Sequence, residues 1–355
     1  MLLSVHRNGQ LLLDATLTEQ LYPRKPYADE APMDTKSLTP TELAQPATVA
    51  CALGCFDILQ EAGFNPDMVA GHSLGELAAL HVAGYMDRET LADVVVRRGQ
   101  AMGGNVNSAT DTAMVAILGA GASGITIPPR SGDVWIANKN GPQQVVVAGA
   151  KADVENFVKS QVPKSFRTVP LAVSNAFHTK FMSSAANNFG NTLREMTPRF
   201  VESMQQITQT GTQVFSNVTG REYPFKHGST TANKENANVI VDTLSKHITS
   251  PVEFIKQVRS MYAAGARVFV EFGPRRALAK FAESILGDKD IVTIAVNATG
   301  PKGADSEVQL RDAVVQLAVC GVSLGKGFDK WALRNIHTLG MLSWLSKCTC
   351  RVLSC

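Results

Sequence analysis

The amino-acid sequence predicts a mixed α/β fold in which a small α+β unit interrupts a larger domain. Helix-like runs alternate with short apolar, strand-like runs along most of the chain. The pattern changes over residues 112–176, where several strand-like runs surround one helix-like run. The length of 355 residues allows one large domain or two smaller ones, and 45% hydrophobic against 18% charged residues provides for a sizeable core.

The larger domain is expected to begin with a helix. Thr39-Pro40-Thr41-Glu42 has the pattern of a capping box with proline at the first helical position. Gly63 is the expected end of that helix. In this part of the chain we expect helices over 41–62, 76–84 and 87–102, and one buried strand over 68–70.

The inserted unit and the rest of the large domain follow. The unit is expected to hold strands within 113–120, 133–140, 143–150 and 166–175, and a helix over 151–160. Beyond it we expect helices near 180–196, 237–247, 252–264, 275–286 and 305–320, strands near 213–216, 266–273 and 290–297, and a polar loop over 220–236. The predicted domains are therefore a core made of 1–111 and 177–325, an inserted unit at 112–176, and a peripheral tail at 326–355.

Charge and hydropathy exclude several classes of protein. Thirty-four Lys and Arg against 31 Asp and Glu give a net charge of +3, so no dedicated nucleic-acid binding is expected. No uninterrupted apolar run approaches the roughly 20 residues of a membrane span. The first residues lack a basic segment followed by a long apolar core, which argues against a secretory signal. We expect a cytoplasmic protein, with a short organellar presequence left open.

Six cysteines do not make a disulfide scaffold in a chain of this length. Cys51 and Cys55 lie four apart in a helix-like run and are expected to be small buried residues. Cys348, Cys350 and Cys355 crowd the last eight residues, where three ligands without a nearby His make a poor metal site. We expect no metal, and we interpret the tail as frayed or as not belonging to the domain.

One motif carries chemistry. Gly71-His72-Ser73-Leu74-Gly75 fits G-x-S-x-G and lies between a predicted strand and a predicted helix, the context of a nucleophile elbow. The turn would hold the Ser73 hydroxyl clear of the backbone, and the Leu74 N–H would face a developing oxyanion. The alternative is a glycine-rich turn with an incidental serine. The motif by itself favours a hydrolase or a transferase.

The longer string GHSLGELAALHVAG, with Arg97-Arg98-Gly99-Gln100-Ala101-Met102 downstream, resembles the malonyl-CoA:acyl-carrier-protein acyltransferases, the loading domains of fatty acid and polyketide synthases. The further matching stretches are, in order, TELAQPA at 41–47, NGPQ with VVVAG at 140–149, NAFHT at 175–179, SPVEF at 250–254 and VEFGP at 270–274. The resemblance covers about residues 38–320 and is especially like the acyltransferase domain of polyunsaturated fatty acid synthases. It implies an α/β-hydrolase-like large domain with an inserted ferredoxin-like small subdomain.

The resemblance also assigns roles to residues. Ser73 would be the nucleophile, and His178 its base. Arg98 would pair with the substrate carboxylate and select malonyl over acetyl groups, and Phe177 would restrict the space beside the α-carbon. The expected substrate-binding residues are His72, Leu74, Arg98 and Phe177.

Chemistry alone leaves some of these roles open. A lone His in an apolar stretch is more often structural, and Arg97 and Arg98 near a helix C-terminus would favourably meet its dipole and solvent. If Arg98 is the substrate residue, Arg97 is its solvated neighbour. No acidic third member of a triad can be chosen. The resemblance implies that a main-chain carbonyl orients His178, at the position of His247, where the family usually has Asn or Gln.

The expected reaction moves a malonyl group from CoA to the phosphopantetheine thiol of an acyl carrier protein, in fatty acid or polyketide synthesis. The expected partners are the CoA thioester, the carrier protein and other synthase modules, and the enzyme itself would bind no cofactor. The alternatives are a thioesterase-like serine hydrolase and an inactive fragment of a multidomain synthase. Before TELAQPA the sequence lacks the family's first strand with its G-Q-G-S-Q type motif, and Gln10 is a poor stand-in, so we expect a weakened oxyanion hole.

Overall fold

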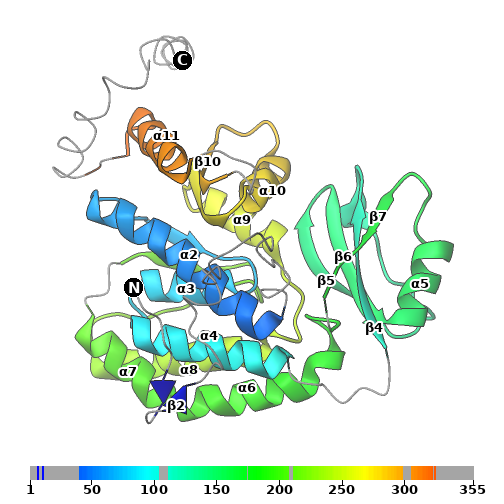
Figure 1. Ribbon diagram of the computed structural model, residues 1–355, viewed down its shortest axis with the longest axis horizontal. Helices are drawn as coiled ribbons and strands as arrows, with labels where there is room; N and C mark the ends of the chain where they lie inside the picture. The colour runs from blue at the N-terminus through cyan, green and yellow to red at the C-terminus, as the bar shows by residue number, and fades with distance from the viewer. Residues whose placement is uncertain are drawn as a thin grey trace, which may run out of the picture.

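The computed structural model describes residues 6–7, 10–11, 40–103, 111–173, 175–207, 211–298, 305–322 and 324. Near the N-terminus, β1 (His6–Arg7) and β2 (Gln10–Leu11) form a small antiparallel pair. The cysteines at 348, 350 and 355 and the predicted tail at 326–355 lie outside the described residues. The described chain has a larger, mostly helical part and a separate four-stranded sheet that stands to one side of it (Figure 1).

Three helices come before and after the first parallel strand in the sequence: α2 (Thr41–Glu61), α3 (Gly75–Val82) and α4 (Arg88–Gly103). The predicted end of α2 is confirmed, since Gly63 takes a φ of 96°, which glycine tolerates without steric cost. Its predicted start is corrected: Pro40 is the cap rather than the first helical residue, and no side chain caps the helix. Asp87 caps α4, because its Oδ1 accepts a hydrogen bond from the Thr90 N–H at 2.6 Å.

Helix α2 also corrects two sequence predictions. Cys51 is exposed, because it lies outside the apolar stripe that packs inward through Val49, Leu53 and Phe56, and Cys55 is half-buried against the apolar cluster that holds Phe56. By length and mean hydropathy (1.2), α2 is the one helix among the described residues that could cross a membrane. A core helix passes the same test, and α2 packs against the apolar residues of other elements, so we interpret it as part of the core.

The second half of the large domain is also mainly helical. It contains η3 (Lys180–Met182), α6 (Ser183–Glu195), α7 (Thr197–Gln206), α8 (Thr230–His247), α9 (Phe254–Ala263), α10 (Ala277–Leu286) and α11 (Ser306–Val319). Helix α8 begins seven residues before its predicted start. Ser229 makes that early start favourable, because its side chain accepts a hydrogen bond from the Ala232 N–H at 3.1 Å. Helix α7 was not predicted as a separate element.

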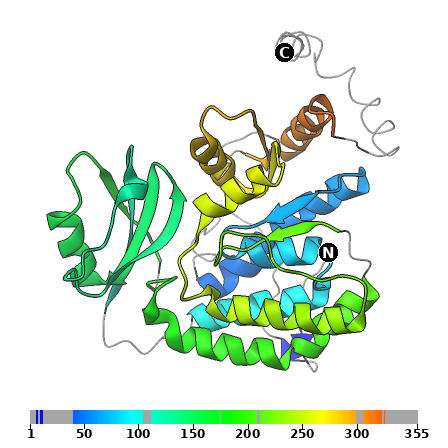
Figure 2. The ribbon, with the colours of Figure 1, turned by 180° about the vertical axis from the view of Figure 1, so that it is seen from behind.

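Four short strands of the large domain form two parallel pairs. β3 (Met68–Ala70) pairs with β8 (Gln213–Phe215), and β9 (Val268–Pro274) pairs with β10 (Val292–Asn297). Among the described residues, β3, β9 and β10 are each paired on one side only, whereas β8 also forms an isolated antiparallel bridge between Phe215 and Glu222. In Figure 2 the β3–β8 pair lies between the layer of α6, α7 and α8 and the part of the molecule that contains β9, β10 and α11. The elbow follows the carboxyl end of β3.

The small sheet consists of β4 (Thr112–Leu118), β5 (Val134–Gly141), β6 (Gln144–Ala150) and β7 (Arg167–Pro170), and α5 (Lys151–Ser160) connects β6 to β7. The strand order is β5-β6-β4-β7, and all neighbours are antiparallel. The connection between β4 and β5 carries only the short 3₁₀ turn η2 (Ala122–Gly124). This sheet is the small ferredoxin-like subdomain beside the α/β-hydrolase-like part, while the predicted boundaries at 111/112 and 176/177 stay predictions.

Strict alternation along the strands gives the small sheet two apolar faces. Val115 and Ile117 of β4 face the cluster that holds Phe157 of α5. Met114 and Ala116 point to the opposite face. That second face packs against Ala176, Phe177 and Phe181, which lie within three residues of His178 in the sequence.

The small sheet is also hydrogen bonded to the large domain along β5. The Val252 N–H donates to the Ala137 carbonyl at 2.9 Å, and the Lys139 N–H donates to the Val252 carbonyl at 2.9 Å. The Lys139 ammonium pairs with the Glu253 carboxylate at 2.6 Å. These bonds make Val252 and Glu253, directly before α9, the hydrogen-bonded junction between the small sheet and the large domain.

Candidate active site

The turn after β3 places Ser73 at the start of α3, as the elbow pattern predicts. Ser73 has a φ of 49°, an uncommon value for a residue with a side chain. Gly71 is required by close packing, since a Cβ there would lie 1.9 Å from the carbonyl carbon of Gly75. The Asn217 side chain ties the turn together: its Oδ1 accepts from the Ser73 N–H at 2.9 Å, and its amide nitrogen donates to the Gly71 carbonyl.

His178 lies directly against the Ser73 hydroxyl, with Nε2 2.9 Å from Oγ. Its Nδ1 lies 3.1 Å from the His247 carbonyl and 3.0 Å from the Ser250 carbonyl. Two carbonyls can only accept, so Nδ1 carries the proton and Nε2 presents a lone pair to Ser73. The structure therefore brings Ser73, His178 and the His247 carbonyl together, and adds the Ser250 carbonyl.

Burial lowers the pKa of His178 well below the usual value, and the nearby side chains of His247, Arg98 and His72 act in the same direction because they disfavour a second positive charge. A neutral imidazole at neutral pH can accept a proton from the Ser73 hydroxyl. His178 also has a positive φ of 62°. The arrangement is a serine and a histidine held in general-base geometry, with main-chain carbonyls in the position of an acidic third residue.

Arg98 lies near the C-terminal end of α4, and its side chain extends into the same site. Its side chain is only 1% exposed. Nη2 donates to Ser73 Oγ at 3.0 Å, and Nη1 donates to Gln45 Oε1 at 2.6 Å. Gly99 permits this approach of α4 to α2, because a Cβ there would lie 2.9 Å from Glu42 Cα.

The Arg98 charge has no direct acidic partner. None of the ion pairs among the described residues involves Arg98, and its Nε has no hydrogen-bond partner there. Burial lowers the pKa of Arg98 to about 10, against an opposing effect from Glu76. Arg97 differs from its predicted role: it is mostly buried, and its Nε pairs with Asp93 at 2.6 Å rather than lying in solvent.

The other predicted residues surround Ser73. His72 Nε2 lies 2.7 Å from Asn140 Oδ1 at the end of β5, which links the elbow to the small sheet. Burial lowers the pKa of His72. Among the described residues no acceptor pairs with the Leu74 N–H, which leaves it available at the helix start. Phe177 is half-buried and packs against both the large core and the small sheet.

Beneath the elbow lies a polar cluster that sequence reasoning missed in part. We define it as Glu76, Arg98, His178, Asn217 and His247, all buried. Glu76 Oε2 accepts from the Asn217 N–H at 2.6 Å and from its side-chain amide at 2.7 Å. The signal for Glu76 was its place directly after the elbow, whereas nothing in the local sequence marked Asn217 or Gln45.

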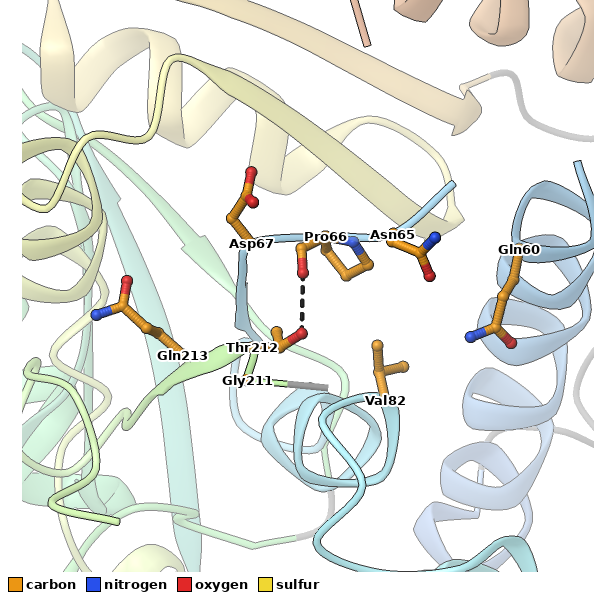
Figure 3. Close-up of a pocket in the computed structure, with 8 residues that line it drawn as sticks. All are labelled: Gln60, Asn65, Pro66, Asp67, Val82, Gly211, Thr212 and Gln213. Atoms are coloured by element: carbon orange, nitrogen blue, oxygen red, sulfur yellow. Dashed lines mark hydrogen bonds between the residues drawn. The ribbon is translucent and has the colours of Figure 1, made fainter. Parts of the chain in front are cut away.

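A separate cavity of about 560 Å³ lies at the opposite end of β3 from the elbow (Figure 3). Its lining residues are Gln60, Asn65, Pro66, Asp67, Val82, Gly211, Thr212 and Gln213. The Thr212 hydroxyl donates to the Pro66 carbonyl at 2.9 Å across one wall. None of the residues that contact Ser73 lines this cavity, so we do not include it in the site. Within the described ranges no cluster of three or more His, Cys, Asp or Glu could hold a metal.

Comparison with known proteins agrees with this geometry. The family model of the acyl transferase domain matches residues 27–322. One of the subunits of a polyunsaturated fatty acid synthase from Thraustochytrium sp. is 43% identical over 317 residues, which cover 89% of this chain and 10% of that protein. The malonyl CoA-acyl carrier protein transacylase of Bacillus subtilis is 31% identical over 272 residues, or 74% of this chain and 78% of that one.

A solved malonyl-transacylase in complex with a type II polyketide synthase acyl-carrier protein matches with a TM-score of 0.61 and 27% identity, covering 80% of this chain and 84% of that one. The chain spans only a tenth of the length of the Thraustochytrium synthase protein that it resembles. The family model nevertheless covers most of the chain, and the elbow, the histidine and the buried arginine lie within the matched residues. The chain therefore belongs to the acyl transferase domain family.

Proposed function

We propose that this chain transfers a malonyl group from coenzyme A to the phosphopantetheine thiol of an acyl carrier protein, through an acyl-enzyme at Ser73. The observation that carries the proposal is the buried Arg98 guanidinium, which lies 3.0 Å from Ser73 Oγ and has no ion-pair partner among the described residues. A buried cation beside a nucleophile favours an acyl group that brings its own carboxylate. The names of the Bacillus subtilis relative and of the solved carrier complex support the same donor and acceptor.

In the first half-reaction, Ser73 Oγ attacks the thioester carbonyl of malonyl-CoA while His178 Nε2 takes the hydroxyl proton. The carbonyl π electrons move onto oxygen and form a tetrahedral oxyanion. Collapse of that oxyanion re-forms the carbonyl and breaks the carbon–sulfur bond. The CoA thiolate leaves and takes the proton from His178, so the products are CoA thiol and malonyl-Ser73.

The Leu74 N–H is the oxyanion donor in this proposal, because it lies directly after the nucleophile at the start of α3 and has no acceptor among the described residues. A donor of this kind typically contributes about 10²–10³ in rate. His72 is expected to line the substrate site, where its bond to Asn140 fixes the ring.

Selectivity is assigned to two side chains. Arg98 pairs with the malonyl carboxylate and so disfavours acetyl groups, which would leave the buried cation unpaired. Phe177 restricts the space beside the α-carbon and so disfavours branched acyl units.

In the second half-reaction, the carrier's phosphopantetheine thiol replaces CoA, and His178 Nε2 takes the thiol proton as the sulfur attacks the carbonyl of the Ser73 ester. Collapse of the resulting oxyanion breaks the bond to Ser73 Oγ, which takes the proton back from His178, so the products are the malonyl-carrier thioester and free Ser73. The carrier is therefore a partner, and other synthase modules are further partners if the chain works as part of a long synthase. The absence of a bound cofactor and the cytoplasmic location remain predictions.

The test is intact-mass analysis after mixing with malonyl-CoA. We expect the mass to rise by one malonyl group, the adduct to be absent in Ser73→Ala, and the adduct to disappear when a phosphopantetheinylated carrier is added. Arg98→Ala should lose malonyl loading by at least about 10²-fold while acetyl loading holds or rises. Arg97→Ala is the matched control, since its guanidinium pairs with Asp93.

An adduct that survives in Ser73→Ala would remove Ser73 as the nucleophile. Equal losses of malonyl and acetyl loading in Arg98→Ala would make Arg98 a structural residue. An adduct that water removes as fast as the carrier does would favour the thioesterase-like alternative.

A further inference from the structure

His247 reaches the active site twice, once through its main chain and once through its side chain. The main-chain carbonyl lies 3.1 Å from His178 Nδ1. The imidazole points to the other side, where Nδ1 lies 3.5 Å from Arg98 Nη2 and Nε2 lies 3.3 Å from Glu76 Oε2. The three side chains, Glu76, His247 and Arg98, are 0%, 1% and 1% exposed. They form a continuous buried chain of contacts.

The neighbours of His247 determine which of its ring nitrogens carries a proton. A guanidinium is a donor only, so Arg98 requires a lone pair on Nδ1. Glu76 is an acceptor when ionised, so it favours a proton on Nε2. The Nε2–H tautomer is compatible with both contacts, because it presents a lone pair on Nδ1 to Arg98 and the Nε2–H to the Glu76 carboxylate. The Nε2 contact is not aligned as a hydrogen bond, which leaves it an electrostatic contact at 3.3 Å.

Glu76 is a fixed support for this tautomer. It accepts hydrogen bonds from the Asn217 main chain and side chain and from the Tyr223 hydroxyl. Burial alone would raise the pKa of Glu76, but the contact with His247 and the hydrogen bonds outweigh it and hold the pKa below its usual value. Because Glu76 stays ionised and anchored, the imidazole beside it is held in one orientation.

Arg98 is a long side chain that needs such support. On the far side its Nη1 donates to Gln45. On the side of the nucleophile, its Nη2 donates to both Ser73 Oγ and His247 Nδ1. Once Ser73 is acylated, its oxygen becomes an ester oxygen and a poorer acceptor, so His247 is the neighbour that continues to hold Nη2.

We propose that the His247 side chain, supported by Glu76, is a positioning residue for Arg98: its Nδ1 accepts from Nη2 and keeps the guanidinium where a substrate carboxylate can reach it. This inference rests on the proposed function, in which Arg98 receives that carboxylate. It is separate from the main-chain role, because substitution of His247 leaves its carbonyl in place for His178.

Two amide substitutions distinguish the roles of the two ring nitrogens of His247. His247→Asn places an amide oxygen near Nδ1 and can still accept from Arg98. His247→Gln extends an amide toward Nε2 and loses the acceptor near Nδ1. Both are neutral and polar, so general disruption of the core should affect them alike, and circular dichroism with thermal unfolding checks that both fold.

The measurement is the rate of Ser73 loading by malonyl-CoA and by acetyl-CoA, as a function of donor concentration. We expect the malonyl-to-acetyl ratio of kcat/KM to fall by about tenfold in His247→Gln, mainly through a higher KM for malonyl-CoA, and to change less than about threefold in His247→Asn. Glu76→Gln should lower the same ratio, because the imidazole is then free to take the other tautomer.

Equal ratios in the two His247 variants, or a ratio unchanged from the wild type in His247→Gln, would overturn the inference. Failure of the proposed function is distinguishable, because the wild-type protein would then show no malonyl adduct on Ser73, or Arg98→Ala would not alter the ratio. If the wild type loads selectively and the two His247 variants still match, only the positioning role of His247 is wrong.

Discussion

The small sheet and the polar cluster beneath the elbow are built on opposite principles. The sheet packs Val115, Ile117 and Phe157 in a wholly apolar layer, in which every contact removes hydrocarbon from water. The polar cluster buries two histidines, an arginine, a glutamate and an asparagine, each at most 5% exposed. Buried polar groups are costly unless they are hydrogen bonded, and charged ones more so.

The backbone shows the same contrast. Ser73 and His178 both have positive φ values, whereas no residue of β4, β5, β6 or β7 does. Backbone strain of this kind costs on the order of 1–3 kcal/mol per residue and persists only where the surroundings enforce it. The comparison teaches that the small sheet contributes stability, while the cluster is maintained at the expense of stability for the sake of a reactive geometry.

Removal of the His178 side chain should give the largest effect on the acylation rate. His178→Ala is expected to slow acylation of Ser73 by about 10²–10⁴-fold, because the hydroxyl then has no proton acceptor. The free energy of unfolding should change little, since a strained, desolvated side chain is removed. Rapid-quench mass analysis with malonyl-CoA measures the rate, and urea unfolding measures the stability.

The matched control is His81→Ala, which removes another histidine, a half-buried one whose Nδ1 bonds the Met86 carbonyl far from the nucleophile. Its acylation rate should stay at the wild-type value. If His178→Ala unfolds the protein while the folded fraction reacts normally, His178 belongs with the structural residues and the comparison fails.

Truncation in the small sheet should give the opposite result. Phe157→Ala empties the middle of the apolar layer and is expected to lower the free energy of unfolding by about 3–5 kcal/mol. Acylation per folded molecule should remain near the wild-type rate, because Phe157 packs on the face of the small sheet opposite the one that meets Phe177. Phe157→Leu, with a smaller loss, is the graded control. A fall in the rate of the folded protein parallel to the loss of stability would show that the two regions are not independent.

The smallest expected effect is in the pH profile. Because the pKa of His178 lies well below 6.5, the acylation rate should be flat between pH 7 and pH 6, whereas a base with a pKa of 6.5 would lose about threefold. The same shift affects stability: below pH 6.5 the unfolded chain binds a proton that the folded chain excludes, so the free energy of unfolding falls as the pH drops toward the folded pKa.

Glu76 acts in the same direction at lower pH, since its lowered pKa supplies stability that is lost as the pH falls below 4.5. His178→Ala should make the upper part of this stability curve less steep and leave the lower part, since His72 and His81 also have lowered pKa values. A threefold loss of acylation rate at pH 6 would contradict a depressed pKa.

The parts of the molecule that sequence patterns predicted are those that depend on near neighbours. The alternation in β4 and β6, the end of α2 at Gly63 and the strand–turn–helix around Ser73 are all local signals. The start of α8 was missed because residues 220–236 are polar and rich in Gly, Ser, Thr and Asn, although Ser229 is a good cap and the helix gains its stability from packing.

The polar cluster could be predicted only in part. The family resemblance indicated Ser73, His178, Arg98 and the His247 carbonyl. The contacts that fix them join residues far apart in the chain: Gln45 meets Arg98 across 53 positions, and Asn217 meets Ser73 across 144. Such pairs have no periodicity or spacing to reveal them, because the tertiary fold alone brings them together. The contacts of the His247 ring nitrogens with Arg98 and Glu76 are likewise set by the tertiary fold and could not be predicted from the sequence.

The hydrogen bonds between β5 and Val252 couple the position of the small sheet to the orientation of His178. Val252 is hydrogen bonded to β5 through both its N–H and its carbonyl, and two residues earlier the Ser250 carbonyl accepts from His178 Nδ1. A rotation of the small sheet relative to the large domain would therefore either break the Val252 hydrogen bonds or move the Ser250 carbonyl. Movement of that carbonyl would reorient the His178 imidazole. Force applied to the sheet by a docked macromolecule would thus be transmitted to the base over a very short stretch of backbone, and exchange of the Val252 and Lys139 amide hydrogens would record it.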